Sequence, residues 1–369
     1  MKVPFFRYTH VFKQDEEELT KAFLRIAESG AFILQQEVEL FEKELAAFCG
    51  VTRAVGVGNA TDGIELILKA LGVEQGDEVI LPAHTFVASA AAVVNVGAMP
   101  VFAEIGTDHL LDSADVIKRI SPQTRAIMPT QLNGRVANMD ALGAVAEEYG
   151  LILLEDSAQG LGSLFGGRMA GTFAPAGVYS FYPAKILGAM GDAGAIITSD
   201  EELADRIFLL RDHGRDSHGG GVQLWGRNSR LDNLQAAFLR VKLAHIDREI
   251  EKRRRLAECY HNALEGVYQI VRPPFDDDLQ RFDVFQNYEV EAEDREALRY
   301  HLTDNGVGTI LQWGGKAVHQ FEALGTFPPL PVTERIMSRS MLLPMNTSLT
   351  EDEVGYVADC ICQFYGVRV

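Results

Sequence analysis

The chain has 369 residues, of which 47% are hydrophobic and 23% are charged. This composition is typical of a globular protein with a large core and argues against a disordered chain. The 34 lysines and arginines against 52 acidic residues leave a net charge of −18, which excludes a broad binding surface for nucleic acid or for an anionic membrane. The length exceeds one ordinary domain of about 150 residues, so we expect a large unit and a smaller one.

Cysteine usage and the first residues indicate the compartment. No cysteine belongs to a C-x-x-C pair or has a histidine at zinc-finger spacing, so we expect reduced thiols and no metal site. The opening MKVPFFRYTH lacks the apolar core of a signal peptide, and residues 87–103 are too short and too interrupted to cross a bilayer. We therefore predict a cytoplasmic protein. The four cysteines are Cys49, Cys259, Cys360 and Cys362.

The first half of the chain predicts a parallel sheet covered by helices. Asp15 with Glu18 resembles a capping box and predicts a helix that ends near Gly30, and a second helical pattern stops at Gly50. From there, short apolar runs alternate with helical periods, which is the pattern of a parallel sheet with both faces covered. The predicted strands are residues 53–58, 78–83, 100–105, 126–131 and 151–156, and the helices between them include residues 62–71, 86–94 and 139–150.

The second half of the chain predicts two further strands at one edge of the sheet and then a smaller domain. Residues 177–181 and 194–199 read as strands joined by a glycine-rich segment, which suggests a hairpin at one edge of the sheet. A helix at 201–212, a glycine-rich loop and one or two long helices at 231–264 follow. We place a boundary near His245, giving a large domain at 1–245 and a small α+β domain at 246–369. The small domain has a strand at 288–293 and helices at 294–305 and 351–364.

One stretch resembles a dinucleotide-binding motif but does not match it fully. GVGNATDG follows a strand and precedes a helix, like a dinucleotide fingerprint, but Thr61 stands where the third glycine belongs. The acidic residues Asp77 and Glu78 precede the next strand, whereas a ribose-binding acid ends it. A nicotinamide-dependent oxidoreductase therefore remains only an alternative. A hydroxyl residue at a helix N-terminus still suits a phosphate group.

The chemical core of the sequence is an acid and an amine on one sheet. Asp156 ends an apolar strand, where an ionised carboxylate needs a cation or donors. Lys185 follows in the turn SFYPAK, where burial would lower the pKa of the amine and make it a nucleophile. Pyridoxal 5'-phosphate (PLP) needs this pair: a lysine that forms an imine with its aldehyde and a carboxylate that keeps its ring nitrogen protonated. Ser180 and the Ala60–Thr61 turn suit its phosphate.

Taken together, several stretches resemble one family, the DegT/DnrJ/EryC1/StrS sugar aminotransferases. These are PLP enzymes of fold type I, which is aspartate aminotransferase-like, with a mostly parallel sheet in a large domain and a smaller α+β C-terminal domain. The resemblance covers most of residues 32–243. It rests on GNATDGIELILKALGVEQGDEVILPAHTFVASA, GAMPVFAEI, NMDALGAVAEEYG, LLEDSAQGLGS, YSFYPAKILGAMGDAGAIITSD and GRNSRLDNLQAAFLRVKL.

The resemblance implies roles for residues around the cofactor. Lys185 is the imine lysine and the acid/base of the proton shift, and its presence sets the chain apart from a dehydratase branch that has histidine there. Asp156 partners the pyridinium, Gln159 neighbours the ring hydroxyl, and Phe86 stacks on the ring. Thr61, the Ala60 N–H and Ser180 contact the phosphate. Asn228 reaches the phosphate from the other subunit, which implies a homodimer with shared active sites.

The acceptor pocket departs from the family pattern. PTQLNG replaces P-x-H-L-x-G, and TILQWGGKAVHQF replaces an H-Y-P-x-P-x-H segment. The resemblance implies amino transfer from an amino acid, usually L-glutamate, to a keto-sugar for cell-surface polysaccharide or lipopolysaccharide. The acceptor is either nucleotide-linked or a free keto-sugar acid such as 8-oxo-3-deoxy-octulosonate, whose carboxylate an arginine would bind. The candidate substrate residues are Arg215, Arg227, Arg230, Trp313, Lys316, His319, Arg7, Tyr8 and His10.

A further alternative is a non-catalytic PLP-binding regulatory protein. The sequence keeps both Lys185 and Asp156 and shows no DNA-binding segment before the domain, which favours an enzyme.

Overall fold

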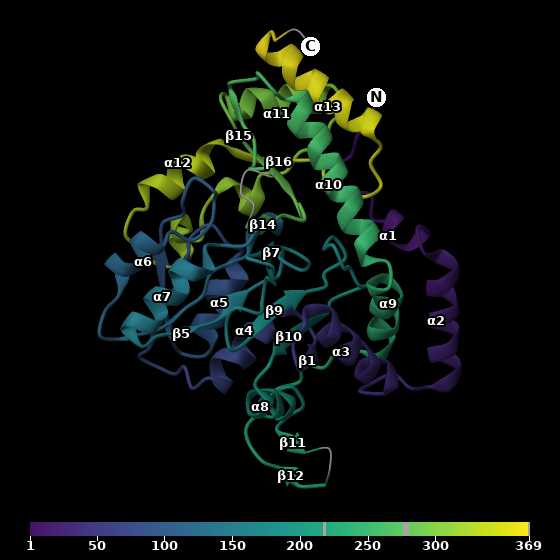
Figure 1. The fold of residues 1–369 in the computed structure, drawn as a ribbon, viewed down its shortest axis with the longest axis vertical. Helices are drawn as coiled ribbons and strands as arrows, with labels where there is room; N and C mark the ends of the chain where they lie inside the picture. The colour runs from purple at the N-terminus through teal and green to yellow at the C-terminus, as the bar shows by residue number, and fades with distance from the viewer. Residues whose placement is uncertain (217–218, 276–279, 368–369) are drawn as a thin grey trace.

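The computed structural model describes residues 1–216, 219–275 and 280–367 (Figure 1). Its helices are α1 (His10–Lys13), α2 (Glu16–Ser29), α3 (Gln36–Cys49), α4 (Ala60–Ala70), α5 (Val87–Asn95), α6 (Ser113–Arg119), α7 (Met139–Tyr149), α8 (Glu201–Arg211), α9 (Asn233–Leu243), α10 (Ile246–Ala263), α11 (Arg295–Asp304), α12 (Pro331–Arg339) and α13 (Glu351–Tyr365). Within this part of the chain, no helix combines the length and apolarity that a membrane span needs.

The strands form one large sheet and several small ones. They are β1 (Arg53–Val57), β2 (Glu78–Pro82), β3 (Met99–Ala103), β4 (Thr124–Ile127), β5 (Ile152–Leu153), β6 (Glu155–Asp156), β7 (Leu164–Phe165), β8 (Arg168–Met169), β9 (Gly177–Ser180), β10 (Gly194–Thr198), β11 (Arg215–Asp216), β12 (Gly221–Val222), β13 (Ile270–Val271), β14 (Arg281–Phe282), β15 (Tyr288–Ala292) and β16 (Ser340–Leu343).

The large sheet runs in the order β3-β2-β4-β5 and continues as β6-β9-β10-β1. A parallel bridge between Thr130 and Asp156 joins the two halves, because β5 and β6 are consecutive pieces of one strand. The pairings β2–β3, β2–β4, β4–β5 and β6–β9 are parallel, whereas β10 runs antiparallel to both β9 and β1. The predicted mostly parallel sheet is thus confirmed.

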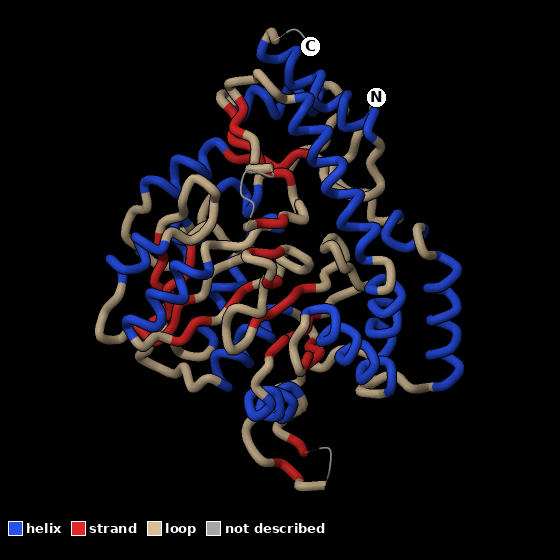
Figure 2. Tube along the Cα trace, in the orientation of Figure 1, coloured by secondary structure: helices blue, strands red, loops and turns tan. Residues whose placement is uncertain are grey.

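Helices cover both faces of this sheet (Figure 2). Along β9, Val178 packs in the cluster that includes α4, α5 and α8 residues, while its neighbour Tyr179 packs with α3 and α9 residues on the other face. The alternation follows from the period of two along a strand. Because both faces are covered, the strands are apolar throughout, as the sequence pattern indicates.

The C-terminal part is built around a second core. The sheet β13-β15-β16 packs with α10, α11 and α13. The N-terminal Val3 belongs to the same core and forms a parallel bridge with Val307, so the first residues lie against the C-terminal part (Figure 1). The long helical region is two helices, with α9 ending at Leu243 and α10 beginning at Ile246. The domain boundary near His245 stays a prediction.

Two local predictions are wrong. Asp15 does stand before α2, but its side chain makes no capping hydrogen bond; its carboxylate instead accepts a hydrogen bond from Arg248 at 2.9 Å, a charged partner 233 residues away. The β9–β10 pair is antiparallel as expected, but it lies inside the sheet and not at its edge. Every residue of β10 is buried, which suits a strand with neighbours on both sides. The helix ends at Gly30 and Gly50 are confirmed, and both glycines adopt the left-handed conformation.

Candidate functional site

The site lies at the carboxyl edge of the large sheet. The loops after β1, β2, β6 and β9 meet there, because these strands run parallel to one another in space. They carry, in chain order, Ala60 and Thr61, Phe86, Gln159 and Lys185, while Asp156 ends β6. Ligands of open α/β sheets bind at this edge.

Asp156 is a buried carboxylate with few partners of its own. Its Oδ2 accepts a hydrogen bond from Ser89 Oγ at 2.6 Å, and Oδ1 accepts one from the Ala158 N–H at 3.1 Å. Burial raises the pKa of this carboxyl, while the Ser89 and Ala158 donors and the charge of Lys185 act in the opposite direction. A positively charged ring nitrogen beside it would keep the carboxylate ionised. Ser89 was missed in the sequence because it sits in a run of small residues on α5.

Lys185 has the properties of a nucleophilic amine. Burial lowers the pKa of its ammonium group to about 8, against an opposing effect of the Asp156 carboxylate. The turn that holds it is tight: the Lys185 N–H donates to the Tyr182 carbonyl at 2.8 Å, and a Cβ on Gly188 would lie 2.4 Å from the Pro183 oxygen. A neutral amine is therefore accessible near pH 8, as imine formation requires.

Lys185 opens into a pocket at the N-terminal segment. Arg7, His10 and Lys242 line this pocket together with Lys185. Burial also lowers the pKa of Lys242 to about 8, and its Nζ donates to the Gly188 carbonyl at 2.7 Å. Sequence reasoning missed Lys242, since it reads as one of several charges on a helix.

The N-terminus of α4 forms a cradle that suits a phosphate group, called here the phosphate cradle. Asn59 caps this helix by accepting a hydrogen bond from the Asp62 N–H at 2.9 Å. Ser180 pairs with Gly194 in the sheet, and a Cβ on Gly194 would lie 2.9 Å from the Ala60 nitrogen. The Ser180 hydroxyl, the first turn of α4 and the bare Gly194 backbone therefore lie together, in an arrangement that suits an anion.

Gln159 is oriented by its neighbours. Its side-chain oxygen accepts hydrogen bonds from the Asn133 N–H at 2.8 Å and from the Asn287 amide at 3.3 Å. With the oxygen occupied, the amide NH₂ group is left to donate to a ligand. Asn133 comes from the PTQLNG segment that departs from the family pattern, and it adopts a left-handed conformation with φ 56°.

Phe86 presents an aromatic face at the same edge. It is 53% exposed, and its ring centroid lies 5.2 Å from that of Trp313 at an interplanar angle of 39°. An exposed ring supported from one side is suited to stacking on a flat ligand. The structure thus brings together Phe86 and Trp313, which are 227 residues apart in the sequence.

Most other candidate substrate residues have partners within the chain. Arg215 and Arg230 pair with Asp212 at 2.8 and 3.2 Å. Arg227 pairs with Asp62 at 2.9 Å and with Glu65. Arg7 pairs with Glu353, and the buried His319 lies 3.0 Å from Glu334. Lys316 and Tyr8 are exposed, and Tyr8 contacts Tyr182 near Lys185.

Asn228 is exposed and lies beside α4 of its own chain. Its neighbour Ser229 accepts a hydrogen bond from the Gly58 N–H at 3.1 Å, and its other neighbour Arg227 pairs with Asp62 on α4. Its two neighbours therefore contact α4 and the loop before it within the same chain, while the Asn228 side chain itself faces solvent.

The acidic residues tested for ribose binding, Asp77 and Glu78, lie at the amino end of β2 and not at its carboxyl end. Glu78 begins β2 and accepts a hydrogen bond from Ser121 Oγ at 2.5 Å. The carboxyl end of β2, where a ribose-binding acid belongs, is occupied by Pro82. The geometry does not support a nicotinamide site.

Comparison with known proteins agrees with this geometry. Residues 13–362 match the DegT/DnrJ/EryC1/StrS aminotransferase family. The chain is 41% identical over 366 residues to the erythromycin biosynthesis sensory transduction protein EryC1 of Saccharopolyspora erythraea, covering 97% of this chain and 98% of the relative. It is 39% identical over 366 residues to a dTDP-3-amino-3,4,6-trideoxy-alpha-D-glucose transaminase of Streptomyces venezuelae, covering 98% and 95%.

A solved structure supports the same assignment. The chain superimposes on S. venezuelae DesV, solved in complex with a ketimine intermediate, with a TM-score of 0.95 at 38% identity, covering 100% of this chain and 99% of that one. The buried acid, the amine of lowered pKa and the phosphate cradle fit PLP as the cofactor. The chain belongs to the DegT/DnrJ/EryC1/StrS aminotransferase family and is a PLP-dependent aminotransferase.

Proposed function

We propose that the protein transfers an amino group from an amino acid, L-glutamate in the first instance, to a keto-sugar linked to a nucleotide. The observation that carries this is the placement of Lys185 and Asp156 beside the α4 phosphate cradle at one sheet edge. When bound, PLP supplies an aldehyde that carries the amino group and a ring that accepts electrons.

Each residue has a proposed task in this reaction. Lys185 provides the neutral amine that binds the cofactor and moves a proton at the carbon that gains nitrogen. Asp156 holds the ring nitrogen protonated, and Gln159 donates to the ring hydroxyl. Phe86 covers one face of the ring and excludes water from it. Ser180, Thr61 and the Ala60 N–H bind the phosphate.

The nucleotide-linked acceptor is preferred over a free keto-sugar acid. The acid was suggested by the arginine-rich loop, but Arg215, Arg227 and Arg230 each pair with a carboxylate of the chain. A substrate carboxylate would have to displace these partners. The S. venezuelae relative is named for a dTDP-linked sugar, which supports the same choice. A role in polysaccharide or lipopolysaccharide synthesis stays a prediction.

The test is a pair of half-reactions followed by absorbance. Glutamate should bleach the visible band of the cofactor, and an acceptor should restore it. We expect restoration by a dTDP- or UDP-linked ketosugar and none by the free keto-sugar acid. Restoration by the acid alone would reverse the acceptor assignment, and no bleaching by any amino acid would favour a non-catalytic PLP-binding protein.

We also propose a homodimer in which Asn228 reaches the partner's phosphate. The β11–β12 hairpin projects from the body (Figure 1) and is followed by Trp225, which is 97% exposed. An exposed tryptophan is typical of an interface. Mixing inactive Lys185→Ala with inactive Asn228→Ala protein should restore part of the activity, because a mixed dimer contains one intact shared site. No restoration, with mixed dimers detected by mass spectrometry, would place each site in one chain.

A further inference from the structure

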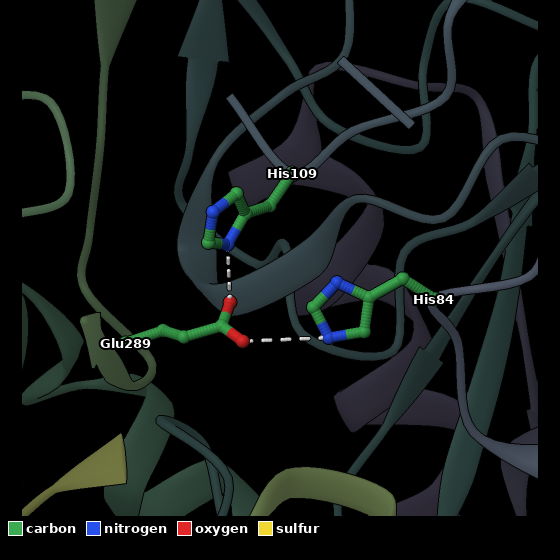
Figure 3. A group of neighbouring side chains, drawn as sticks. All are labelled: His84, His109 and Glu289. Carbon is green, nitrogen blue, oxygen red and sulfur yellow. Dashed lines mark hydrogen bonds and ion pairs between the residues drawn. The ribbon is translucent and has the colours of Figure 1, made fainter. Parts of the chain in front are cut away.

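Two histidines and a glutamate meet at the junction between the sheet edge and β15. His84 follows β2, His109 lies in the loop after β3, and Glu289 lies on β15. Figure 3 shows both imidazole rings directed at the Glu289 carboxylate. Glu289 Oε2 lies 2.9 Å from His109 Nδ1, and Oε1 lies 3.5 Å from His84 Nε2. One atom from each residue forms a group within 4.8 Å of one another.

The cluster leaves buried polar atoms without hydrogen bonds. His84 is 1% exposed and Glu289 is 4% exposed. Among the described residues, no hydrogen bond of good geometry reaches either nitrogen of His84 or Oε1 of Glu289, although the side chains of Gln312 and Ser340 lie near them. Buried polar groups are normally satisfied, and an exception calls for a missing ligand or a special role. His84 Nε2 and Glu289 Oε1 face one another (Figure 3), so one ligand placed between them would satisfy both of these atoms.

The surroundings resemble the outer shell of a metal site. A ligating histidine commonly donates its second nitrogen to a carboxylate, and ligating carboxylates are themselves hydrogen-bonded. His109 Nε2 lies 3.3 Å from Glu291 Oε1, and the Asn133 amide donates to Glu289 Oε2 at 2.7 Å. The charge of Glu291 is in turn shared with Arg335 at 3.5 Å and Arg339 at 3.6 Å.

We propose that His84, His109 and Glu289 bind a divalent transition-metal ion, with Zn²⁺ as the best match to two imidazoles and one carboxylate. Ligands of a tetrahedral zinc ion with bonds of about 2.0–2.2 Å lie about 3.3–3.6 Å apart. The separations of 2.9 and 3.5 Å, each from one histidine to a different oxygen of the Glu289 carboxylate, are close to this range. The widest gap, at most 4.8 Å, has to close by at most about 1.5 Å, which side-chain rotation can supply.

The ion would have an entry path and a mechanical role. A pocket lined by His109, Asn133, Asn287 and Glu289 leads to the cluster, and a water from it can take the fourth position. His84 stands two residues before Phe86, so the ion would tie the ring-stacking segment to β15.

The sequence predicts no metal because the three ligands lie in segments up to 205 residues apart, and no short motif contains two of them.

The test is zinc binding by the PLP-loaded enzyme, freed of its tag and of metal. Calorimetric titration with ZnCl₂ should show one site per chain, and elemental analysis after dialysis should find one zinc retained. His84→Ala removes a ligand together with its 3.5 Å contact to Glu289 and should weaken binding by about 100-fold or more. Asn133→Ala should weaken it by about 10-fold. His301→Ala removes a histidine of α11 outside the cluster and should bind zinc like the unmodified protein.

Two results would overturn the proposal. One is no zinc uptake by the unmodified protein at micromolar concentration. The other is undiminished uptake by both His84→Ala and Glu289→Gln, which would place the ion elsewhere. If Glu289→Gln fails to fold by circular dichroism, His84→Ala decides alone. All these readouts are independent of catalysis, so failure of the proposed reaction would not affect them.

Discussion

Capture of PLP by the cofactor-free protein should follow the ionisation of Lys185. Only the neutral amine attacks an aldehyde, and burial lowers the pKa of Lys185 to about 8. At pH 7 an amine of this pKa is about 9% neutral, whereas one of ordinary pKa near 10.4 is about 0.04% neutral. The structure therefore predicts capture about 200-fold faster than an exposed lysine would allow.

The assay is stopped-flow absorbance of the apoprotein mixed with PLP between pH 6 and 10. The rate should rise with pH and level off above about pH 8. Asp156→Asn should shift the midpoint below 8, because the Asp156 carboxylate raises the pKa of Lys185 and its removal leaves burial unopposed.

A neighbouring lysine provides the matched control. Lys242 lines the same pocket, and burial lowers its pKa to about 8 as well. Lys242→Met should keep rapid capture, and Lys185→Ala should abolish it. A midpoint near 10, or capture lost in Lys242→Met and kept in Lys185→Ala, would refute the reasoning.

Three further outcomes are expected. Asp156→Ala should still bind PLP but lose turnover by several orders of magnitude, because the ring nitrogen is no longer held protonated; normal steady-state rates would contradict this role. Gly194→Ala should lower the free energy of unfolding in urea by about 1–3 kcal/mol for the apoprotein, since the added Cβ would lie 2.8 Å from the Asn59 carbonyl carbon. Gly355→Ala is the control, because open space surrounds its Cβ. Equal unfolding midpoints for the two variants would argue against the close approach at Gly194. Glu42→Leu should cost about 3–5 kcal/mol in the same assay by leaving the buried Arg211 unpaired, and a neutral result would show that this pair is dispensable.

The sequence predicts the parts of the molecule that local physics controls. Gly30 and Gly50 end their helices because glycine takes the left-handed conformation easily. The apolar strands indicate a covered parallel sheet, and the acid at the end of β6 and the amine after β9 indicate the candidate site. These signals need only the residues of one segment and the rule that parallel strands end at one edge.

The features that the sequence did not predict depend on contacts between residues far apart in the chain. Arg248 binds Asp15 in place of the expected cap, and the position of β10 depends on its pairing with β1, which lies about 140 residues earlier. The arginines near Asn228 are neutralised by Asp62, Glu65 and Asp212. Such pairings arise from tertiary contacts, so no local sequence pattern predicts them.

The β1–β10 pairing also constrains how the chain is made. Residues 53–57 emerge early from the ribosome, but the strand that covers them, 194–198, follows only after half of the protein has been synthesised. Until then β1 has an open edge that invites wrong pairing. A nascent chain stalled before Gly194 would also lack one wall of the phosphate cradle, so vitamin B6 could not help it fold through that contact.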